Sequence, residues 1–521
     1  MDQFTLICLL VASIVVLTPA ADWLRIPQPV LLTIFGLAVA LVPGSPQLQF
    51  DPELILPVVL PPLLFAATQR ATAREFRDHA GAVFFLAVGL TLATVGAVGL
   101  VAHQLGLSWW VALMLGAMVS PPDPVAATAV ARRLRLPHRM VTILEGEGMF
   151  NDATALVAFK VTMAAVVTGK VSGPHVGAEL VLAVLVGTSL GVALGAATKA
   201  VLAVVHDGYA ETTLTVLVPF LAYVGAERLQ GSGVLAVLAL GLYLRTYGHA
   251  ATTSQGWLLG RGVWSYADFL ITSLVFTILG YELVKVIDRT QVSRDAVVLA
   301  ALVVITLIGL RAGWVFAGAG FARRRSRHRD EPIPQGWRES VVVSWAGMRG
   351  VVTVAATLAL PEVVDRGQPF PDRDQIVVVA LAVVLVTLVL QGLTLAPLTR
   401  HLGVGRDDDD AFEVTQLRQR AAQAALDHLR QDRPSGLSDE VSQAATMQYE
   451  GYLAAQNAMA RARAHDDRDP GGQDQLSSVL HKASTVERNL VLDARRRGEV
   501  SPASADEVLR DIEGRALRDF Q

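Results

Sequence analysis

Long apolar runs alternate with short polar loops along most of the chain. A transmembrane helix requires about 20 predominantly apolar residues. On this criterion the pattern predicts thirteen membrane-spanning helices and an all-α fold. The predicted spans cover residues 4–21, 27–44, 54–69, 79–103, 108–131, 143–167, 178–204, 211–228, 232–247, 264–287, 295–320, 338–360 and 374–400.

The apolar pattern ends near Gly403, and the remaining residues are mostly Arg, Asp, Glu, Gln and Ala. This change predicts a transmembrane domain, 1–403, and a charged helical domain, 404–521. A Ser504 and Glu507 pair fits a helix-capping box. The expected tail helices cover residues 412–431, 438–465, 474–497 and 502–518. Two roles remain open for this domain, regulation of transport and support of dimerisation.

The basic residues predict the orientation of the spans, because short cytoplasmic loops hold the excess of Lys and Arg. With the N-terminus outside, the loops assigned to the inside carry most of these residues, including Arg132, Arg133, Arg135 and Arg139. This places the charged tail in the cytoplasm of a cell-membrane protein. The first segment, MDQFTLICLL, lacks the basic region of a secretory signal, so we expect a retained helix, with a cleaved leader as the alternative.

Composition supports the membrane assignment and excludes several classes of protein. Of the 521 residues, 52% are hydrophobic and 17% charged, and the net charge of -3 gives no basic bias toward nucleic acid. Cys8 is the single cysteine, so no intrachain disulfide forms. The sequence contains no GxxxxGK[ST] loop and no HExxH motif, so neither an ATP-driven pump nor an enzyme is expected, and no cofactor is predicted.

Five ionisable side chains lie inside the apolar runs, where each charge costs on the order of 3 kcal/mol or more. They are Asp123, Glu147, Asp152, Arg311 and Arg349. Counting along the predicted spans places Asp123, Asp152 and Arg349 near the midplane, with Glu147 and Arg311 somewhat nearer the cytoplasm. Such residues face a cavity or pair with each other, so the pattern indicates an ion pathway.

Prolines surround Asp123 and predict a break in the span 108–131, because proline lacks a backbone donor and clashes with the preceding turn. They are Pro121, Pro122 and Pro124. Irregular backbone at this depth is tolerated where it lines protein or a cavity. The segment Ser120 to Pro124 is therefore expected to offer carbonyl oxygens beside the Asp123 carboxylate, and these ligands suit a hard cation.

A second break is predicted in the span 338–360, where Gly347 and Gly350 flank Arg349. Paired interrupted helices in corresponding halves of a chain indicate an inverted-repeat secondary transporter with its site at the midplane. Arg349 and Arg311 are interpreted as structural residues of the core, with ion contact as the alternative.

The span 143–167 carries two acids with different expected roles. Glu147 and Asn151 share a helix face, whereas Asp152 is turned by about 100°. Arginine is the natural partner of Glu147, because it stays charged and engages a carboxylate through two hydrogen bonds. Asp152 and Asp123 then lie near each other, and desolvation with a neighbouring like charge allows such an acid to exchange a proton for a cation.

Other polar residues receive interpretations without ion contact. Asp207, Asp268 and Glu282 lie near predicted span ends and are interpreted as interfacial. Lys160 is expected to snorkel or to form an ion pair. The glycine-rich stretch GTSLGVALGAA in the span 178–204 is interpreted as a packing face. The run Asp407 to Asp410 could bind a divalent ion or serve as a solvated linker.

The motifs around these residues resemble the sodium/proton exchanger family, in the bacterial branch of the monovalent cation/proton antiporter-1 group. In chain order the motifs are IPQPVLLTIFGLAVAL, LPPLLFAA, SPPDPVAATAV, LEGEGMFNDATALV and GMRGVVTVAATLALP. The resemblance implies a thirteen-helix antiporter with inverted repeats and with crossed, partly unwound fifth and twelfth helices. It also implies an ion-binding bundle, a separate dimerisation bundle and a homodimer.

The resemblance assigns roles to individual residues. Asp152 takes the place of the aspartate that carries the cation and the proton, with Asp123 beside it as a second Na⁺ contact. Asn151 and Ser120 are expected to bind the ion with these two acids. The position of Asn151 before Asp152 implies electroneutral exchange of one cation per proton. Glu147 matches the glutamate that pairs with a core arginine, and depth favours Arg311 over Arg349 as its partner.

Two departures from the family pattern remove candidate oxygen ligands. Gly148 stands where the family often has Ser, and Ala66 stands where many relatives have an acid. The sequence predicts an Na⁺(Li⁺)/H⁺ antiporter and leaves selectivity between sodium and potassium open. K⁺/H⁺ exchange by the same mechanism and a non-transporting membrane ion sensor are the alternatives.

Overall fold

The computed structural model of the chain forms two compact units, Met1–Arg406 and Asp407–Gln521. The described residues are 3–24, 26–42, 52–69, 85–123, 127, 136, 138–168, 173–248, 251–289, 293–325, 336–365, 367–404, 409–431, 439–465, 485–494, 497, 508–509 and 512.

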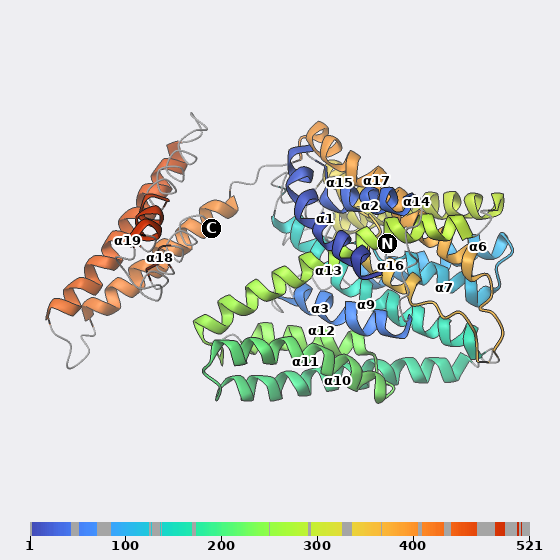
Figure 1. Cartoon of the computed structure of the whole chain (residues 1–521), viewed down its shortest axis with the longest axis horizontal. Coiled ribbons are helices and arrows are strands. Elements are labelled where there is room, and N and C mark those ends of the chain that lie inside the picture. Colours follow the sequence, from blue (N-terminus) through green and yellow to red (C-terminus); the bar gives the residue numbers. More distant parts are fainter. Residues whose placement is uncertain are drawn as a thin grey trace. The chain divides into compact units, whose positions relative to one another are not determined.

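The first unit consists of helices, and each range predicted as a span overlaps one helix or a pair of consecutive helices (Figure 1). Within the described residues, seven helices are long and apolar enough to cross a membrane. The prediction of an all-α, multi-pass membrane protein is thereby confirmed. The helices are α1 (Gln3–Leu24), α2 (Gln28–Ala40), α3 (Pro52–Thr68), η1 (Phe85–Leu90), α6 (Thr91–Gln104), α7 (Trp109–Val119), α9 (His138–Thr168), α10 (Gly173–Leu202), α11 (Gly208–Arg228), α12 (Gly233–Tyr243), η2 (Leu244–Gly248), α13 (Ser254–Arg289), α14 (Arg294–Arg325), α15 (Trp337–Trp345), α16 (Val351–Leu358) and α17 (Arg373–Leu402).

Two hydrophobic clusters hold the first unit together. The larger one contains fully buried residues of α7, α14, α16 and α17, such as Leu115, Val303 and Leu381. The smaller one joins α3, α11 and α12 to α13, where the rings of Phe65 and Trp264 lie 4.6 Å apart between centroids.

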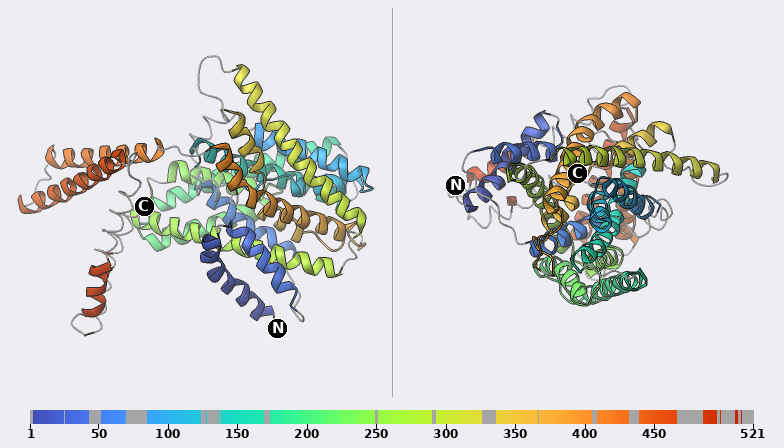
Figure 2. Two further views of the ribbon diagram at one scale, coloured as in Figure 1. Left: turned by 90° about the horizontal axis from the view of Figure 1, so that it is seen from above. Right: turned by 90° about the vertical axis from the view of Figure 1, so that its right-hand side faces the viewer.

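Helices α10, α11 and α12 pack on one another along one side of this unit, as Figures 1 and 2 show. Two glycines of α10 allow the close approach of α12. A β carbon on Gly187 would lie 2.5 Å from the Ser232 carbonyl oxygen, and one on Gly191 would overlap the Ala236 carbonyl. Small residues let helix backbones approach within a membrane. The interpretation of the glycine-rich stretch as a packing face is therefore confirmed.

The second unit contains α18 (Asp409–Gln431) and α19 (Asp439–His465), which pack against each other, and a helix at 485–494. Gln419 Nε2 of α18 donates to Asn457 Oδ1 of α19 at 2.9 Å, and Arg430 Nη2 donates to Glu450 Oε1 at 2.6 Å. Helices were expected in all three places. The Ser504 and Glu507 pair and the first half of the Asp407 to Asp410 run lie outside the described residues.

Candidate functional site

Two non-helical segments meet inside the first unit. The helix α7 ends at Val119, and residues 120–123 are not helical. The helix α15 ends at Trp345, residues 346–350 are not helical, and α16 begins at Val351. The backbone N–H of Asp123 donates to the Met348 carbonyl at 2.6 Å, which joins the two segments directly. Pro121 and Pro122 lie in the first segment, whereas Pro124 lies outside the described residues.

We call the meeting point of segments 120–123 and 346–350 the junction. Arg349 and Asp123 lie there at helix ends of opposite polarity. Arg349 Nε donates to the carbonyl of Val119, the last residue of α7, at 2.6 Å, and Nη1 donates to the Gly347 carbonyl at 2.5 Å. The carboxylate of Asp123 packs against Gly350, the N-cap of α16. Cations are stabilised at helix C-termini and anions at N-termini. The charge of Arg349 is therefore stabilised by backbone oxygens and the α7 dipole.

Glycine is required at position 350 because a β carbon there would overlap the Asp123 carboxylate. We expect Gly350→Ala to destabilise the protein by about 1–3 kcal/mol, as overpacking of a filled site does. The measurement is the thermal denaturation of purified protein in detergent. Gly309→Ala is the matched control, because a β carbon on Gly309 of α14 meets nothing within 4 Å. Equal denaturation temperatures for the two variants would contradict this prediction.

Glu147 and Arg311 form a buried ion pair between α9 and α14. Arg311 Nη1 donates to Glu147 Oε1, and Nη2 donates to Oε2 at 3.0 Å. Their exposed fractions are 1% and 2%. Arg311 Nε also donates to the Val343 carbonyl of α15 at 3.2 Å. The pair links three helices and satisfies both charges without a transported ion.

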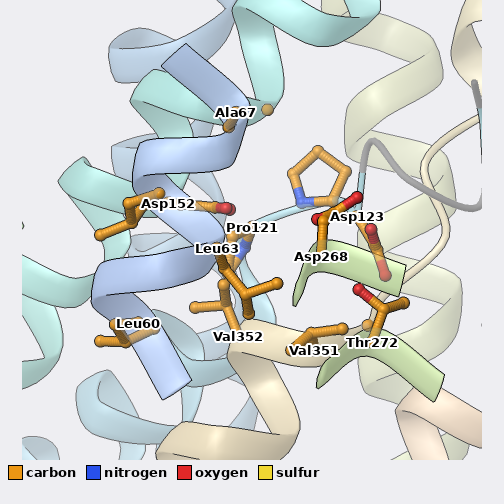
Figure 3. A pocket seen from close by; sticks show the side chains of 14 residues that line it. Leu60, Leu63, Ala67, Pro121, Asp123, Asp152, Asp268, Thr272, Val351 and Val352 are labelled. Carbon is orange, nitrogen blue, oxygen red and sulfur yellow. The ribbon is translucent and has the colours of Figure 1, made fainter. Parts of the chain in front are cut away.

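A pocket of about 60 Å³ lies beside the junction, with room for roughly four water molecules. Asp123 and Asp152 both line it, so the structure brings together the two acids that the sequence proposed for the ion. Figure 3 shows the Asp152 side chain entering from one side and Asp123 lying on the other. The lining consists of Leu60, Leu63, Leu64, Ala67, Pro121, Pro122, Asp123, Gly148, Asp152, Asp268, Thr272, Gly350, Val351 and Val352.

Two other sequence candidates are buried but are not among the lining residues. Ser120 is 2% exposed and its hydroxyl donates to the Ala117 carbonyl at 3.0 Å. Asn151 is fully buried, and within the described part of the chain neither of its amide atoms has a hydrogen-bond partner. A buried amide without partners carries a free-energy cost. Ala66 is also buried outside the lining, and its neighbour Ala67 faces the pocket instead.

The interpretation of Asp268 as an interfacial residue is wrong. Asp268 is 8% exposed and lines the pocket with Asp123 and Asp152 (Figure 3). The helix α13 begins at Ser254, whereas the apolar run predicted a start at residue 264. Asp268 therefore lies well inside the helix. Thr272, one turn further along α13, also lines the pocket and was not predicted as a site residue.

Lys160 pairs with Glu227 of α11, and Glu227 Oε1 also accepts from the Gly233 backbone N–H at 2.9 Å. Pairing was one of the two roles expected for Lys160. Asp207 is exposed, and its carboxylate caps α11 by accepting from the Ala210 N–H at 2.8 Å. Neither residue lines the pocket. Lys160 links α9 to α11, and Asp207 caps α11.

Among the described residues, no three acidic, histidine or cysteine side chains are grouped closely enough to hold a metal ion by themselves. A cation in this pocket would thus be coordinated by carboxylate oxygens together with hydroxyl, carbonyl and water oxygens. Those ligands suit hard cations. The small volume and the mixed donor set fit a small monovalent or divalent cation that retains part of its water.

Comparison with known proteins gives consistent matches over the first unit. The family model described as "Sodium/hydrogen exchanger, transmembrane" matches residues 9–401. An uncharacterized Na(+)/H(+) exchanger of Mycobacterium tuberculosis is 35% identical over 427 residues, covering 81% of this chain and 78% of that protein. The sodium, potassium, lithium and rubidium/H(+) antiporter of Bacillus subtilis is 31% identical over 421 residues, covering 77% of this chain and 62% of that protein.

The fold also matches a solved structure. The sodium proton antiporter MjNhaP1 from Methanocaldococcus jannaschii superposes with a TM-score of 0.61, covering 77% of this chain and 98% of that one. The sequence identity is 19%, so this likeness concerns the fold alone.

Proposed function

Because the chain belongs to the sodium/hydrogen exchanger family, we propose that it exchanges Na⁺, or Li⁺, for H⁺ across the cell membrane by alternating access. It is a transporter, not an enzyme. The observation that carries the proposal is the pocket at the junction of two non-helical segments, lined by Asp123 and Asp152. Secondary transporters bind their substrates where interrupted helices meet near the membrane midplane.

In the proposed cycle, Na⁺ and H⁺ compete for the Asp152 carboxylate. When the pocket opens toward the cytoplasm, Na⁺ displaces the proton and is held with Asp123 and water. After the helices around the pocket move, protons from outside displace Na⁺ under the proton gradient. Glu147 and Arg311 neutralise each other in two hydrogen bonds and so hold α9 and α14 together through the cycle.

We further propose exchange of one cation for one proton, which moves no net charge. Asn151 stands before Asp152, so that position offers no second carboxylate. The membrane potential should then leave the exchange rate unchanged. Na⁺ and H⁺ are the transported substrates, and no cofactor takes part.

The proposed topology has thirteen spans, inverted repeats with crossed broken helices, an external N-terminus and a cytoplasmic tail. The transport domain is 1–403 and the helical domain is 404–521. The segments 120–123 and 346–350 support the crossing, because the Asp123 N–H and the Met348 carbonyl bond across it. We propose that two copies assemble as a homodimer.

K⁺/H⁺ exchange at the same pocket is the second candidate. It is favoured by the similarity to the Bacillus subtilis protein, whose name includes potassium and rubidium. It is also consistent with Gly148, which lines the pocket without contributing a side-chain oxygen. A pocket with fewer fixed ligands discriminates less between cations of different size.

The test is proton movement in everted vesicles from cells that lack their own antiporters. A pH-sensitive dye quenched by the acid interior should regain fluorescence when NaCl or LiCl is added, and collapsing the membrane potential should not change the rate. Recovery with KCl and not with NaCl would establish the second candidate. No recovery with any of the three salts, in vesicles shown to contain the protein, would overturn the proposed function.

A further inference from the structure

Two polar residues of α13, Asp268 and Thr272, face the pocket without a role in the proposed exchange at Asp152. They are four residues apart and therefore share one face of the helix. Their exposed fractions are 8% and 6%, and both line the pocket. Figure 3 shows the Asp268 and Thr272 side chains on the same side of the pocket as Asp123, across from Asp152.

The Thr272 hydroxyl is unusual for a buried threonine in a helix. Such a hydroxyl ordinarily bonds to the carbonyl four residues earlier. Thr277 on the same helix does this, because its hydroxyl donates to the Ser273 carbonyl at 2.8 Å. Among the described residues, the Thr272 hydroxyl has no hydrogen-bond partner, although it is nine-tenths buried. Burying an unpaired hydroxyl is unfavourable unless something in the pocket contacts it.

The opposite walls of the pocket supply few oxygen atoms. The α3 wall consists of apolar side chains, including Leu60, Leu63 and Ala67, and Gly148 of α9 has no side chain. A small cation requires several oxygen ligands. Besides Asp123 and Asp152, the side-chain oxygens lining the pocket are those of Asp268 and Thr272.

We propose that Asp268 and Thr272 bind the transported cation directly, through one carboxylate oxygen and the hydroxyl oxygen, and complete its coordination with Asp152, Asp123 and water. This inference deepens the proposed function and rests on it. In this chain, α13 would supply the side-chain oxygens that Gly148 and the apolar α3 wall do not. The affinity for the cation would then depend on Asp268 and Thr272 of α13 as well as on Asp123 at the junction.

The test compares Thr272→Val and Asp268→Asn with wild type in the vesicle assay and in ²²Na⁺ binding to purified protein. Thr272→Val removes the hydroxyl at nearly constant shape and changes no charge. We expect each substitution to raise the apparent KM for Na⁺ and to weaken ²²Na⁺ binding by about tenfold, which corresponds to the loss of one good ligand. Thr277→Val is the matched control and should leave the apparent KM and the ²²Na⁺ binding unchanged.

The outcomes separate this inference from the proposed function. If wild type exchanges Na⁺ for H⁺ and Thr272→Val has the wild-type KM and binding, the inference is wrong and the proposed function stands. A higher KM for Asp268→Asn with no change for Thr272→Val also overturns it, because charge alone then explains the effect. If wild type shows no exchange, the proposed function fails, and ²²Na⁺ binding to the purified variants decides whether α13 holds the ion.

Discussion

Arg311→Ala is expected to destabilise the membrane unit by about 3–5 kcal/mol, because it leaves Glu147 as an unpaired buried charge. The guanidinium of Arg311 makes both hydrogen bonds to the Glu147 carboxylate and a third to the Val343 carbonyl. Both side chains are nearly inaccessible to solvent. The measurement is the denaturation temperature in detergent, followed as loss of the monodisperse protein peak.

Two further variants serve as controls for the Arg311→Ala prediction. Arg430→Ala removes one partner of an exposed ion pair with Glu450 in the second unit, where a loss of about 0–1 kcal/mol is expected. The double variant Glu147→Met with Arg311→Met removes both charges and should be more stable than Arg311→Ala. A denaturation temperature for Arg311→Ala equal to that of Arg430→Ala would refute the prediction.

The helices and the central acids could be predicted from the sequence because the bilayer imposes a strict rule on length and polarity. Each apolar run had to form a helix, and the charges within those runs had to face one another or a cavity. The prolines at 121 and 122 and the glycines at 347 and 350 indicated where the helices stop. Depth along the spans also favoured Arg311 as the partner of Glu147, and the two side chains lie together in the structure.

The role of α13 could not be predicted because hydropathy measures apolar length and not helix length. With 36 residues, α13 rises about 54 Å, whereas the hydrocarbon core is about 30 Å thick. Its first ten residues include Arg261 and are too polar to score as a span. The predicted start was therefore too late, and Asp268 was placed at an interface. The π-helical turns η1 and η2 likewise leave no hydropathy signal.

The positions of Ser120 and Asn151 show a second limit of sequence reasoning. Spacing along a helix gives the face of a residue but not the hydrogen bonds that its side chain forms. Ser120 uses its hydroxyl within its own turn, and Asn151 lies next to the pocket acid without lining the pocket. Their assignment as ion ligands remains a prediction, whereas the Thr272 hydroxyl is buried and belongs to a residue that lines the pocket.

Asp152→Asn is expected to reduce Na⁺-dependent proton movement in everted vesicles to the level of vesicles without the protein. Asparagine has nearly the same shape as aspartate, but its amide neither ionises nor carries the exchanged proton. Asp152 lines the pocket from the α9 side, where Gly148 contributes no side-chain oxygen. The variant should keep the wild-type denaturation temperature, because the substitution removes a half-buried charge, and none of the ion pairs described above involves Asp152.

Asp207→Asn is the matched control, because Asp207 is exposed and caps α11, and asparagine caps a helix about as well. It should exchange Na⁺ for H⁺ at the wild-type rate. Asp152→Glu keeps an acid that is one methylene longer, so partial exchange is expected from it. If Asp152→Asn restored dye fluorescence on NaCl addition as wild type does, the cation and the proton would have to be carried by another acid. Asp123 and Asp268 in the same pocket would then be the residues to substitute next.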